Sequence, residues 1–323
     1  MPTRAVQTAF AKCAWLLIFL LCATGTFGAP QQAASDAADV VHVEMRNVMY
    51  HFTDRIAVHI FFLQGLLTPT KQGAIPTFDD KNSFELSLDS GKISIGCDAL
   101  ANIFNENVFS TPDSPIHHIA ISAEGDLLKI KGRLHSKGDL PFELDGSLSL
   151  TPTGEILIHT QRIKAVHLPV KGLLDLLGVN FSGFINTNKI RGIRTEGNDL
   201  ALNPEEILPP PHIRGRVTSI HIEGNYIVEF YGTGKPGKAT LQSGNYMRYE
   251  GGTLRFGKLT MSDADLTLID MDPQDPFDFS IDHYKEQLVA GYSKTTPSFG
   301  LRVFMKDFDK LPRPSTASKH SPH

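Results

Sequence analysis

The feature that most constrains the fold of this chain is an alternation of apolar with polar residues that recurs along its length. It is clearest in FELSLDS (84–90), LLKIKGRLH (127–135) and FELDGSLSL (142–150). Successive side chains of a β-strand point to opposite faces, so a period of two indicates strands with one buried and one solvated face. Such strands pair most simply as antiparallel neighbours, and the pattern therefore predicts a β-dominated chain.

Turns that contain glycine separate the strand-like segments. AEGD (123–126), SKGD (136–139), TPTGE (151–155) and IEGN (222–225) each place a glycine between two such segments. Glycine adopts the positive φ values that many tight turns require. We therefore expect a meander of long, strongly curved strands.

Two segments break the alternation and indicate short helices. In CDALANIFNENVF (97–109), Leu100, Ile103 and Phe104 are spaced so that they share one helical face. The second segment, VKGLLDLLGVNFSGF (170–184), predicts a helix that is apolar on most sides and therefore has to be covered on most sides. Its large apolar residues include Leu173, Leu174, Leu176, Leu177, Phe181 and Phe184.

Residues 1–28 have the composition of a secretory signal peptide. A basic start precedes an apolar run over 13–23 and then small residues. We expect cleavage after Gly28, followed by a linker over 29–39. A retained membrane anchor is the alternative, but the apolar run is shorter than the ~20 residues that a spanning helix needs.

Removal of this segment would leave Cys97 as the one cysteine of the mature chain. An intramolecular disulfide and a cysteine-based zinc site would then be excluded, so the fold has to be stabilised by a hydrophobic core. Loss of Arg4 and Lys12 would reduce the 31 basic residues to 29 against 35 acidic ones, which changes the formal net charge from −4 to −6. A mildly acidic chain without a basic stripe is a poor partner for nucleic acid.

The second half of the chain adds further strand-like runs. The triple proline at 209–211 predicts a stiff, extended segment ahead of the run at 213–232. Beyond a loop at 232–245, strand-like runs resume at 251–270, 272–292 and 299–308. We expect a curved-sheet domain over 40–235, a β-rich extension packed on the same sheet over 236–308, and a disordered tail over 309–323.

Motifs that carry chemistry are weak in this sequence. GGTLRFGK (251–258) has the spacing of a phosphate-binding loop, but Leu259 stands where that loop requires Ser or Thr. DMDPQDPFD (270–278) could hold an ion, although its two prolines and its lack of glycine favour a solvated acidic turn. Its carboxylates are those of Asp270, Asp272, Asp275 and Asp278. We expect no catalytic residue, no cofactor and no metal site.

The histidines are spread over the strand-like runs without a catalytic spacing. His117 and His118 are adjacent, so we expect them to point to opposite sides of a strand. The others in such runs, mostly expected on polar faces, are His42, His59, His159 and His221.

The order of elements over residues 84–231 is distinctive. A strand leads into the helix of KISIGCDALANIF (92–104), a meander follows, and then come the Leu-rich LPVKGLLDLLG (168–178) and a proline-led hairpin at 208–228. This order resembles that of the LmeA-type bacterial envelope lipid-binding proteins. Their fold is similar to the tubular lipid-binding (TULIP) superfamily, in which a highly twisted antiparallel sheet curls around a helix and encloses an apolar tunnel for acyl chains.

The resemblance implies an α+β, β-dominated fold, with a highly curved antiparallel sheet wrapped around short amphipathic helices and with additional C-terminal strands. It also implies a non-catalytic, secreted, periplasmic protein that carries or presents a phospholipid or a similar amphiphile. An acyl chain gains ~0.8 kcal/mol per buried CH₂ and needs few polar partners. The residues expected to line or gate the tunnel are Leu100, Ile103, Phe104, Leu173, Leu174, Leu176, Leu177, Phe181 and Phe184.

Two other functions stay open. A structural or assembly factor of the cell envelope would use the apolar helix to dock a partner protein or the membrane surface. An envelope enzyme could use the aspartates of 270–278. The leucines of 170–184 could equally form plain core, so the sequence leaves both a tunnel and a solid interior as outcomes.

Overall fold

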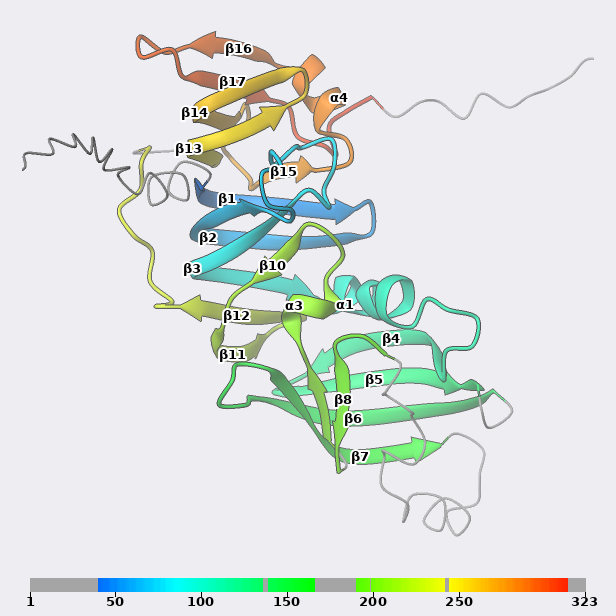
Figure 1. Cartoon of the computed structure of the whole chain (residues 1–323). Coiled ribbons are helices and arrows are strands. Elements are labelled where there is room, and N and C mark those ends of the chain that lie inside the picture. Colours follow the sequence, from blue (N-terminus) through cyan, green and yellow to red (C-terminus); the bar gives the residue numbers. More distant parts are fainter. Residues whose placement is uncertain (1–39, 136–138, 166–189, 198, 242–243, 313–323) are drawn as a thin grey trace, which may run out of the picture. The chain divides into compact units, whose positions relative to one another are not determined.

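The computed structural model describes residues 40–135, 139–165, 190–197, 199–241 and 244–312. Within these ranges the chain forms two β-sheets and a few short helices (Figure 1). The sheets are curved and mainly antiparallel, which confirms the prediction of a β-dominated chain.

The larger sheet has eleven strands in the part of the chain that the structure describes. They are β1 (Val41–Thr53), β2 (Ile56–Pro69), β3 (Phe84–Gly96), β10 (His212–Arg214), β11 (Val217–Glu223), β12 (Tyr226–Gly232), β13 (Tyr246–Phe256), β14 (Leu259–Asp270), β15 (Phe277–Ser280), β16 (Tyr292–Thr295) and β17 (Leu301–Met305). Their main order is β11-β12-β3-β2-β1-β13-β14-β17-β16, with β10 beside β3 and β15 beside β1. The strands after residue 240 therefore belong to the same sheet as β1 to β3.

Strand β1 connects the two parts of this sheet. Along one edge it pairs with β2, and along the other it pairs first with β13 (Arg46 opposite Tyr246) and then with β15 (from Val48 onward). Asn47 lies at the change of partner, has a φ of +50°, and donates from Nδ2 to Oδ1 of Asn245 at 2.9 Å. Asparagine tolerates this left-handed conformation better than most residues, and its amide bridges the place where β13 begins.

The smaller sheet has six strands among the described residues, and all of its neighbours are antiparallel. They are β4 (Ile116–Glu124), β5 (Leu127–Leu134), β6 (Leu140–Leu150), β7 (Ile156–Ala165), β8 (Ile193–Glu196) and β9 (Asp199–Leu202). The predicted strand segments at 127–135 and 142–150 are β5 and β6. Gly125 and Gly154, in the turns that follow β4 and β6, have positive φ values, as their turns were expected to require.

Three strand pairs depart from the antiparallel expectation: β10 with β3, β15 with β1, and β14 with β17. Parallel neighbours require a connection that crosses back over the sheet. The connections here include α3 (Pro204–Ile207) before β10 and α4 (Tyr284–Val289) before β17. Alternation reports which face of a strand is buried, but it carries no information about the direction of the neighbouring strand.

The helix expected at 97–109 is present as α1 (Cys97–Ile103), which continues into one π-helical turn, η1 (Phe104–Val108). Helix α4 corrects the expected strand-like run over 272–292, and α3 was not foreseen. Asn203 caps α3 by accepting from the backbone N–H of Glu205 at 3.1 Å, and Pro204 occupies the first turn. Within the described ranges, no helix is both long enough and apolar enough to cross a bilayer.

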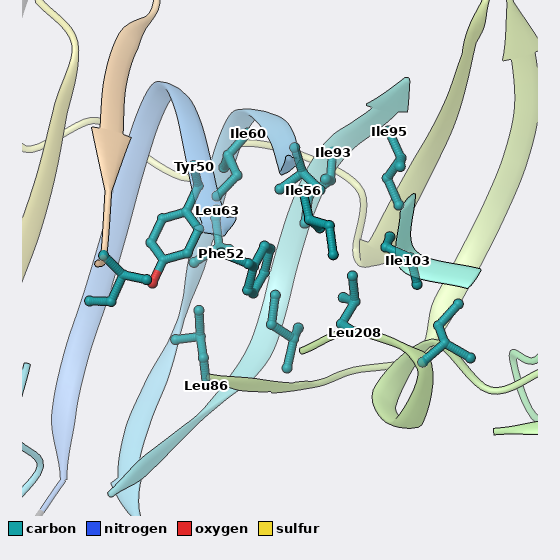
Figure 2. Packing of buried hydrophobic residues seen from close by; sticks show 14 of the residues in the cluster. Tyr50, Phe52, Ile56, Ile60, Leu63, Leu86, Ile93, Ile95, Ile103 and Leu208 are labelled. Atoms are coloured by element: carbon teal, nitrogen blue, oxygen red, sulfur yellow. The ribbon is translucent and has the colours of Figure 1, made fainter. Parts of the chain in front are cut away.

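One continuous hydrophobic cluster includes residues of both sheets and of α1. Figure 2 shows part of it, with Phe52 of β1, Leu63 of β2 and Ile103 of α1 among the labelled side chains, all of which are at most 1% exposed. Burial of such side chains contributes roughly 1.5–3 kcal/mol each relative to exposure. This cluster supplies the stability that the single cysteine of the described chain, Cys97, cannot supply as a disulfide.

Gly65 of β2 is required by close backbone approach. The register between β2 and β3 shifts at Gln64 and Gly65, and a Cβ at Gly65 would overlap the backbone carbonyl oxygen of Ser87. Gly91 of β3 is different, because a Cβ there would meet its nearest atom, the carbonyl oxygen of Phe62, at an ordinary 3.5 Å.

We predict that Gly65→Ala lowers the free energy of unfolding by about 1–3 kcal/mol, because the strands must separate to admit the methyl group. Gly91→Ala is the matched control and should stay within about 1 kcal/mol of wild type. Urea unfolding of the two variants measures both values. Equal stabilities for the two variants would contradict the close backbone approach that we assign to Gly65.

Candidate functional site

The predicted apolar site falls partly on described residues. Leu100, Ile103 and Phe104 are all buried, with 4%, 0% and 4% of their surfaces exposed. Phe104 lines an apolar pocket beneath the smaller sheet, whereas Leu100 and Ile103 belong to the surrounding core. The other six residues, from Leu173 to Phe184, lie outside the described residues, so their role stays a prediction.

The pocket at Phe104 is formed entirely by apolar side chains. It has a volume of about 30 Å³. Its lining residues are Phe104, Phe109, Ile116, Ile119, Ile130, Phe142, Leu144, Ile158, Ile193, Leu200 and Leu202. They come from η1, the segment after it, and all six strands of the smaller sheet.

A second apolar pocket lies within the larger sheet. It is lined by residues of β1, β2, β3, β10 and β13 together with Phe78, Pro211 and Ile281, and its volume is about 20 Å³. Ligand pockets usually measure roughly 300–1,000 Å³, and about 10–15 Å³ is needed to hold one water. Among the described residues, both pockets are therefore packing voids, and neither holds an acyl chain without rearrangement of its walls.

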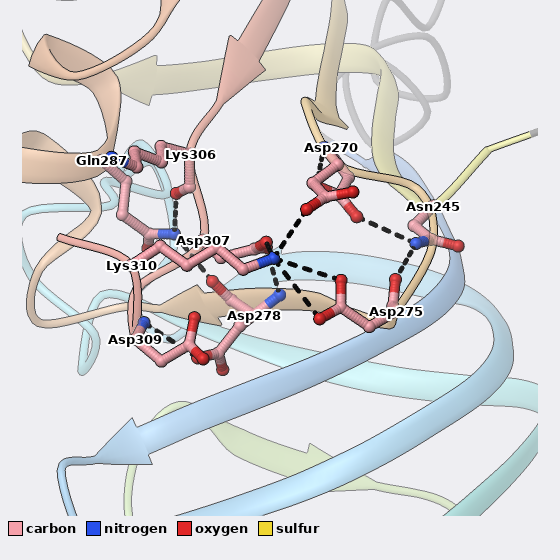
Figure 3. Close-up of polar contacts among 10 residues, drawn as sticks. Asn245, Asp270, Asp275, Asp278, Gln287, Lys306, Asp307, Asp309 and Lys310 are labelled. Atoms are coloured by element: carbon pink, nitrogen blue, oxygen red, sulfur yellow. Dashed lines mark hydrogen bonds and ion pairs between the residues drawn. The ribbon is translucent and has the colours of Figure 1, made fainter.

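The acidic segment 270–278 contributes to a polar cluster with residues from the end of the chain (Figure 3). Lys310 Nζ donates to Oδ2 of Asp272 and Oδ2 of Asp307, each at 2.9 Å. It also lies 3.3 Å from both carboxylate oxygens of Asp275. Lys310 was expected to lie in a disordered tail over 309–323. Instead the described chain continues to Pro312, and the Lys310 ammonium contacts the carboxylates of Asp272, Asp275 and Asp307.

Asp270 is held on the other side of this cluster. Asn245 Nδ2 donates to Asp270 Oδ2 at 2.9 Å, and the backbone N–H of Asp272 donates to Oδ1 at 2.7 Å. Burial raises the pKa of Asp270 to about 6, although the hydrogen bond from Asn245 acts in the opposite direction. Burial also raises the pKa of Asp307, which is 1% exposed.

The carboxylate oxygens of this cluster have the chemistry of cation ligands, but here the positive charge is that of the Lys310 side chain. Ligand oxygens of Asp270, Asp275 and Asp307 lie within 4.8 Å of one another. The ammonium of Lys310 contacts two of the three, so a protein cation stands where a metal would bind. Asp278 is separate: its Oδ1 is 2.5 Å from Nε2 of His51, and its Oδ2 accepts from the backbone N–H of Asp309.

We predict that Lys310→Met lowers the free energy of unfolding more at pH 7 than at about pH 2.5, which lies below the ordinary aspartate pKa of 3.8. Hydrogen bonds from Lys310 lower the pKa of Asp272, so this pairing stabilises the folded state at neutral pH, and the stabilisation is lost as pH falls through the lowered pKa. Exposed Lys258→Met is the matched control and should leave stability unchanged. Chemical unfolding at both pH values provides the measurement, and a pH-independent loss would contradict the account.

A second buried carboxyl lies on β12 and was not anticipated from the sequence. Glu229 is 3% exposed, faces Ile93 across the β3–β12 ladder, and accepts a hydrogen bond from Tyr231 Oη at 2.7 Å. Burial raises the pKa of Glu229 to about 7, and the tyrosine hydrogen bond offsets part of that effect. Glu229 interrupts the otherwise apolar run 227–231, so the alternation that marks half-buried strands gives no indication of which face it lies on.

Glu229→Gln should therefore stabilise the protein at pH 8 by on the order of 3 kcal/mol, because it removes a buried charge and keeps an acceptor for Tyr231. Because the folded-state pKa is raised, wild-type stability falls as pH rises from the ordinary glutamate pKa of 4.5 to about 7. The difference between variant and wild type should thus vanish near pH 4.5. Exposed Glu223→Gln is the control in the same urea titrations, and a constant difference across pH would refute the assignment.

Three residues on the polar face of the smaller sheet form a Ser–His–Asp chain. Ser149 Oγ is 2.5 Å from His159 Nε2, and His159 Nδ1 is 2.7 Å from Asp199 Oδ2. The order of atoms matches that of a catalytic triad. However, Ser149 lies within the regular strand β6 and not at a turn that presents its hydroxyl beside free N–H groups. We therefore interpret these two hydrogen bonds as cross-strand contacts that join β6, β7 and β9.

His42 and His221 are exposed, as expected for histidines on the polar face of a strand. His59 Nε2 is 2.8 Å from Asn47 Oδ1, which extends the polar contacts at the change of partner along β1. His118 departs from the expected strand geometry: its φ is +54° and the β4–β5 register shifts between His117 and Ala120. The two adjacent histidine rings consequently lie 4.8 Å apart and not on opposite faces.

Comparison with known proteins gives no match to a family model, to a curated protein or to a solved structure. The candidate residues are interpreted from their own geometry.

Proposed function

We propose that this chain is a secreted, periplasmic, non-catalytic protein that carries or presents a phospholipid or a similar amphiphile. The observation that carries the proposal is the apolar pocket of the smaller sheet, in which every lining residue is a large hydrophobic one. Acyl chains are recognised by dry surfaces of this kind, with few polar contacts. The resemblance of residues 84–231 to LmeA-type proteins and the apolar segment 170–184 support the same proposal.

The small volume of the pocket sets a condition on this function. At about 30 Å³ it must widen before an acyl chain enters. Transfer of a long chain from water supplies on the order of 10 kcal/mol at ~0.8 kcal/mol per CH₂, before the costs of association and of separating packed side chains. Binding is thus expected to be coupled to movement of the walls.

We predict that Ile193→Phe weakens binding of a fluorescent acyl probe at least fivefold, because its ring fills the pocket of the smaller sheet. Ile60→Phe is the matched control, since it places the same ring in the pocket of the larger sheet. Both variants should lose a similar 1–3 kcal/mol of stability from overpacking. Fluorescence titration of the untagged protein measures the binding.

The function itself is tested by purifying the chain without detergent and extracting it for lipid, with native mass spectrometry of the same sample. Recovery of a bound amphiphile supports the proposal. No bound lipid together with no probe uptake by the wild type would reject it, whatever the behaviour of the variants.

A structural or assembly factor of the cell envelope is the second candidate, and the packed interior favours it. Its docking surface would be an apolar segment, and the described chain also exposes Val289 (85%) and Phe299 (91%). In-cell crosslinking at these positions separates the two functions: a stoichiometric protein partner without bound lipid supports the second.

A further inference from the structure

A group of side chains with metal-ligand chemistry lies at one end of the smaller sheet, and its members belong neither to the lining of the apolar pocket nor to the Lys310 cluster. It consists of His117 on β4, His135 just after β5 and Asp139 just before β6. One ligand atom from each of the three lies within 4.8 Å of the others. We propose that these residues bind a divalent transition metal ion of the zinc class. This inference does not depend on the proposed lipid function.

Strand pairing brings the three residues together. The backbone N–H of His135 donates to the carbonyl oxygen of Pro115 at 2.9 Å, which holds the end of β5 beside the start of β4. Leu134 pairs with Leu140 in the β5–β6 ladder, so His135 and Asp139 flank the same end of that hairpin. The ring centroids of His117 and His135 lie 5.6 Å apart, and His117 Nε2 is 2.5 Å from Asp139 Oδ1.

The donor set suits zinc and its neighbours better than calcium or magnesium. Two imidazole nitrogens and one carboxylate oxygen bind zinc at about 2.0–2.2 Å, so tetrahedral ligands lie roughly 3.3 Å apart. Calcium and magnesium prefer oxygen ligands. To bind the ion, His117 Nε2 and Asp139 Oδ1, now 2.5 Å apart, have to separate by about 1 Å, and His135 has to approach them. The fourth position is open to water.

Arg133 positions the carboxylate. Its Nε donates to Asp139 Oδ2 at 2.8 Å, while Oδ1 faces His117. A hydrogen bond to the second oxygen of a ligating carboxylate is a common way of orienting it toward a metal. The guanidinium charge also opposes a dication, so we expect moderate affinity.

Backbone conformation at the cluster is unusual. His118 and Asp139 both have left-handed conformations, with φ of +54° and +66°. Residues other than glycine adopt this region at a cost, and such strain collects at functional sites. The polar cluster of Asp270, Asp275 and Asp307 gives the contrasting case, because Lys310 contacts its carboxylates directly. Arg133, by comparison, donates to the far oxygen of Asp139, and Oδ1 stays directed at His117.

The test is calorimetric titration of the untagged full chain with Zn²⁺. We expect His135→Gln and Asp139→Asn to bind one equivalent fewer than wild type, or to bind it at least tenfold more weakly. His221→Gln, an exposed histidine outside the cluster, is the control and should bind as wild type does. The same stoichiometry and affinity in wild type and His135→Gln would overturn the proposal.

Thermal unfolding and Co²⁺ spectra distinguish loss of this site from misfolding of a variant and from zinc bound elsewhere. Addition of Zn²⁺ should raise the thermal midpoint of wild type and of His221→Gln, because the ion binds the folded state. The midpoint of His135→Gln should match wild type without metal and should not respond to it. Co²⁺ in place of Zn²⁺ should give visible absorption bands of a four-coordinate site in wild type, and loss of those bands in Asp139→Asn is expected. Bands that persist in both variants would place the metal elsewhere and reject the site.

Discussion

The larger sheet depends on how strand β1 is shared. Its first residues pair with β13 and its later ones with β15, while β2 covers the opposite edge along most of its length. Asn47 allows the change of partner, because its left-handed backbone and its amide hydrogen bond to Asn245 join the two pairings. Asn245 also donates a hydrogen bond to Asp270, so it links the change of partner at Asn47 to the polar cluster around Lys310.

The packed interior and the polar clusters follow from one arrangement of strands. Alternate side chains of both sheets meet in one apolar cluster, which leaves voids of about 20 and 30 Å³. The opposite faces carry the charged residues, and these pair across strands, as in the chain of Ser149, His159 and Asp199. Glu229 is one of several buried carboxyls; it lies among apolar side chains and accepts a hydrogen bond from Tyr231.

Local patterns in the sequence predicted much of this fold, because they report on local geometry. The alternation located β3, β5 and β6, and the spacing of Leu100, Ile103 and Phe104 located α1. Direction and partner of a strand depend on contacts distant in sequence, so the parallel pairs were not foreseen. Helix α3 could have been predicted from Asn203 and Pro204, which together form a helix-start signal.

The candidate sites were harder to predict for the same reason. The aspartates of 270–278 are close in sequence and were recognised as a group, but Lys310, which contacts Asp272 and Asp275, comes from a segment that composition assigned to disorder. His117, His135 and Asp139 have no motif spacing, since a strand register and a hairpin bring them together. The roles of Leu173 to Phe184 stay predictions, because these residues lie outside the described chain.

The sharing of β1 also has a consequence for how the protein is made. Asn47 and Asn245 are separated by 198 residues, so one edge of β1 finds its partners after most of the chain has left the ribosome. Until then β1 presents unpaired backbone groups and an apolar face, which is the kind of edge that recruits other strands. Pairings this distant in sequence also form slowly. The first strands therefore have to be kept apart from those of other copies until β13 and β15 have been made.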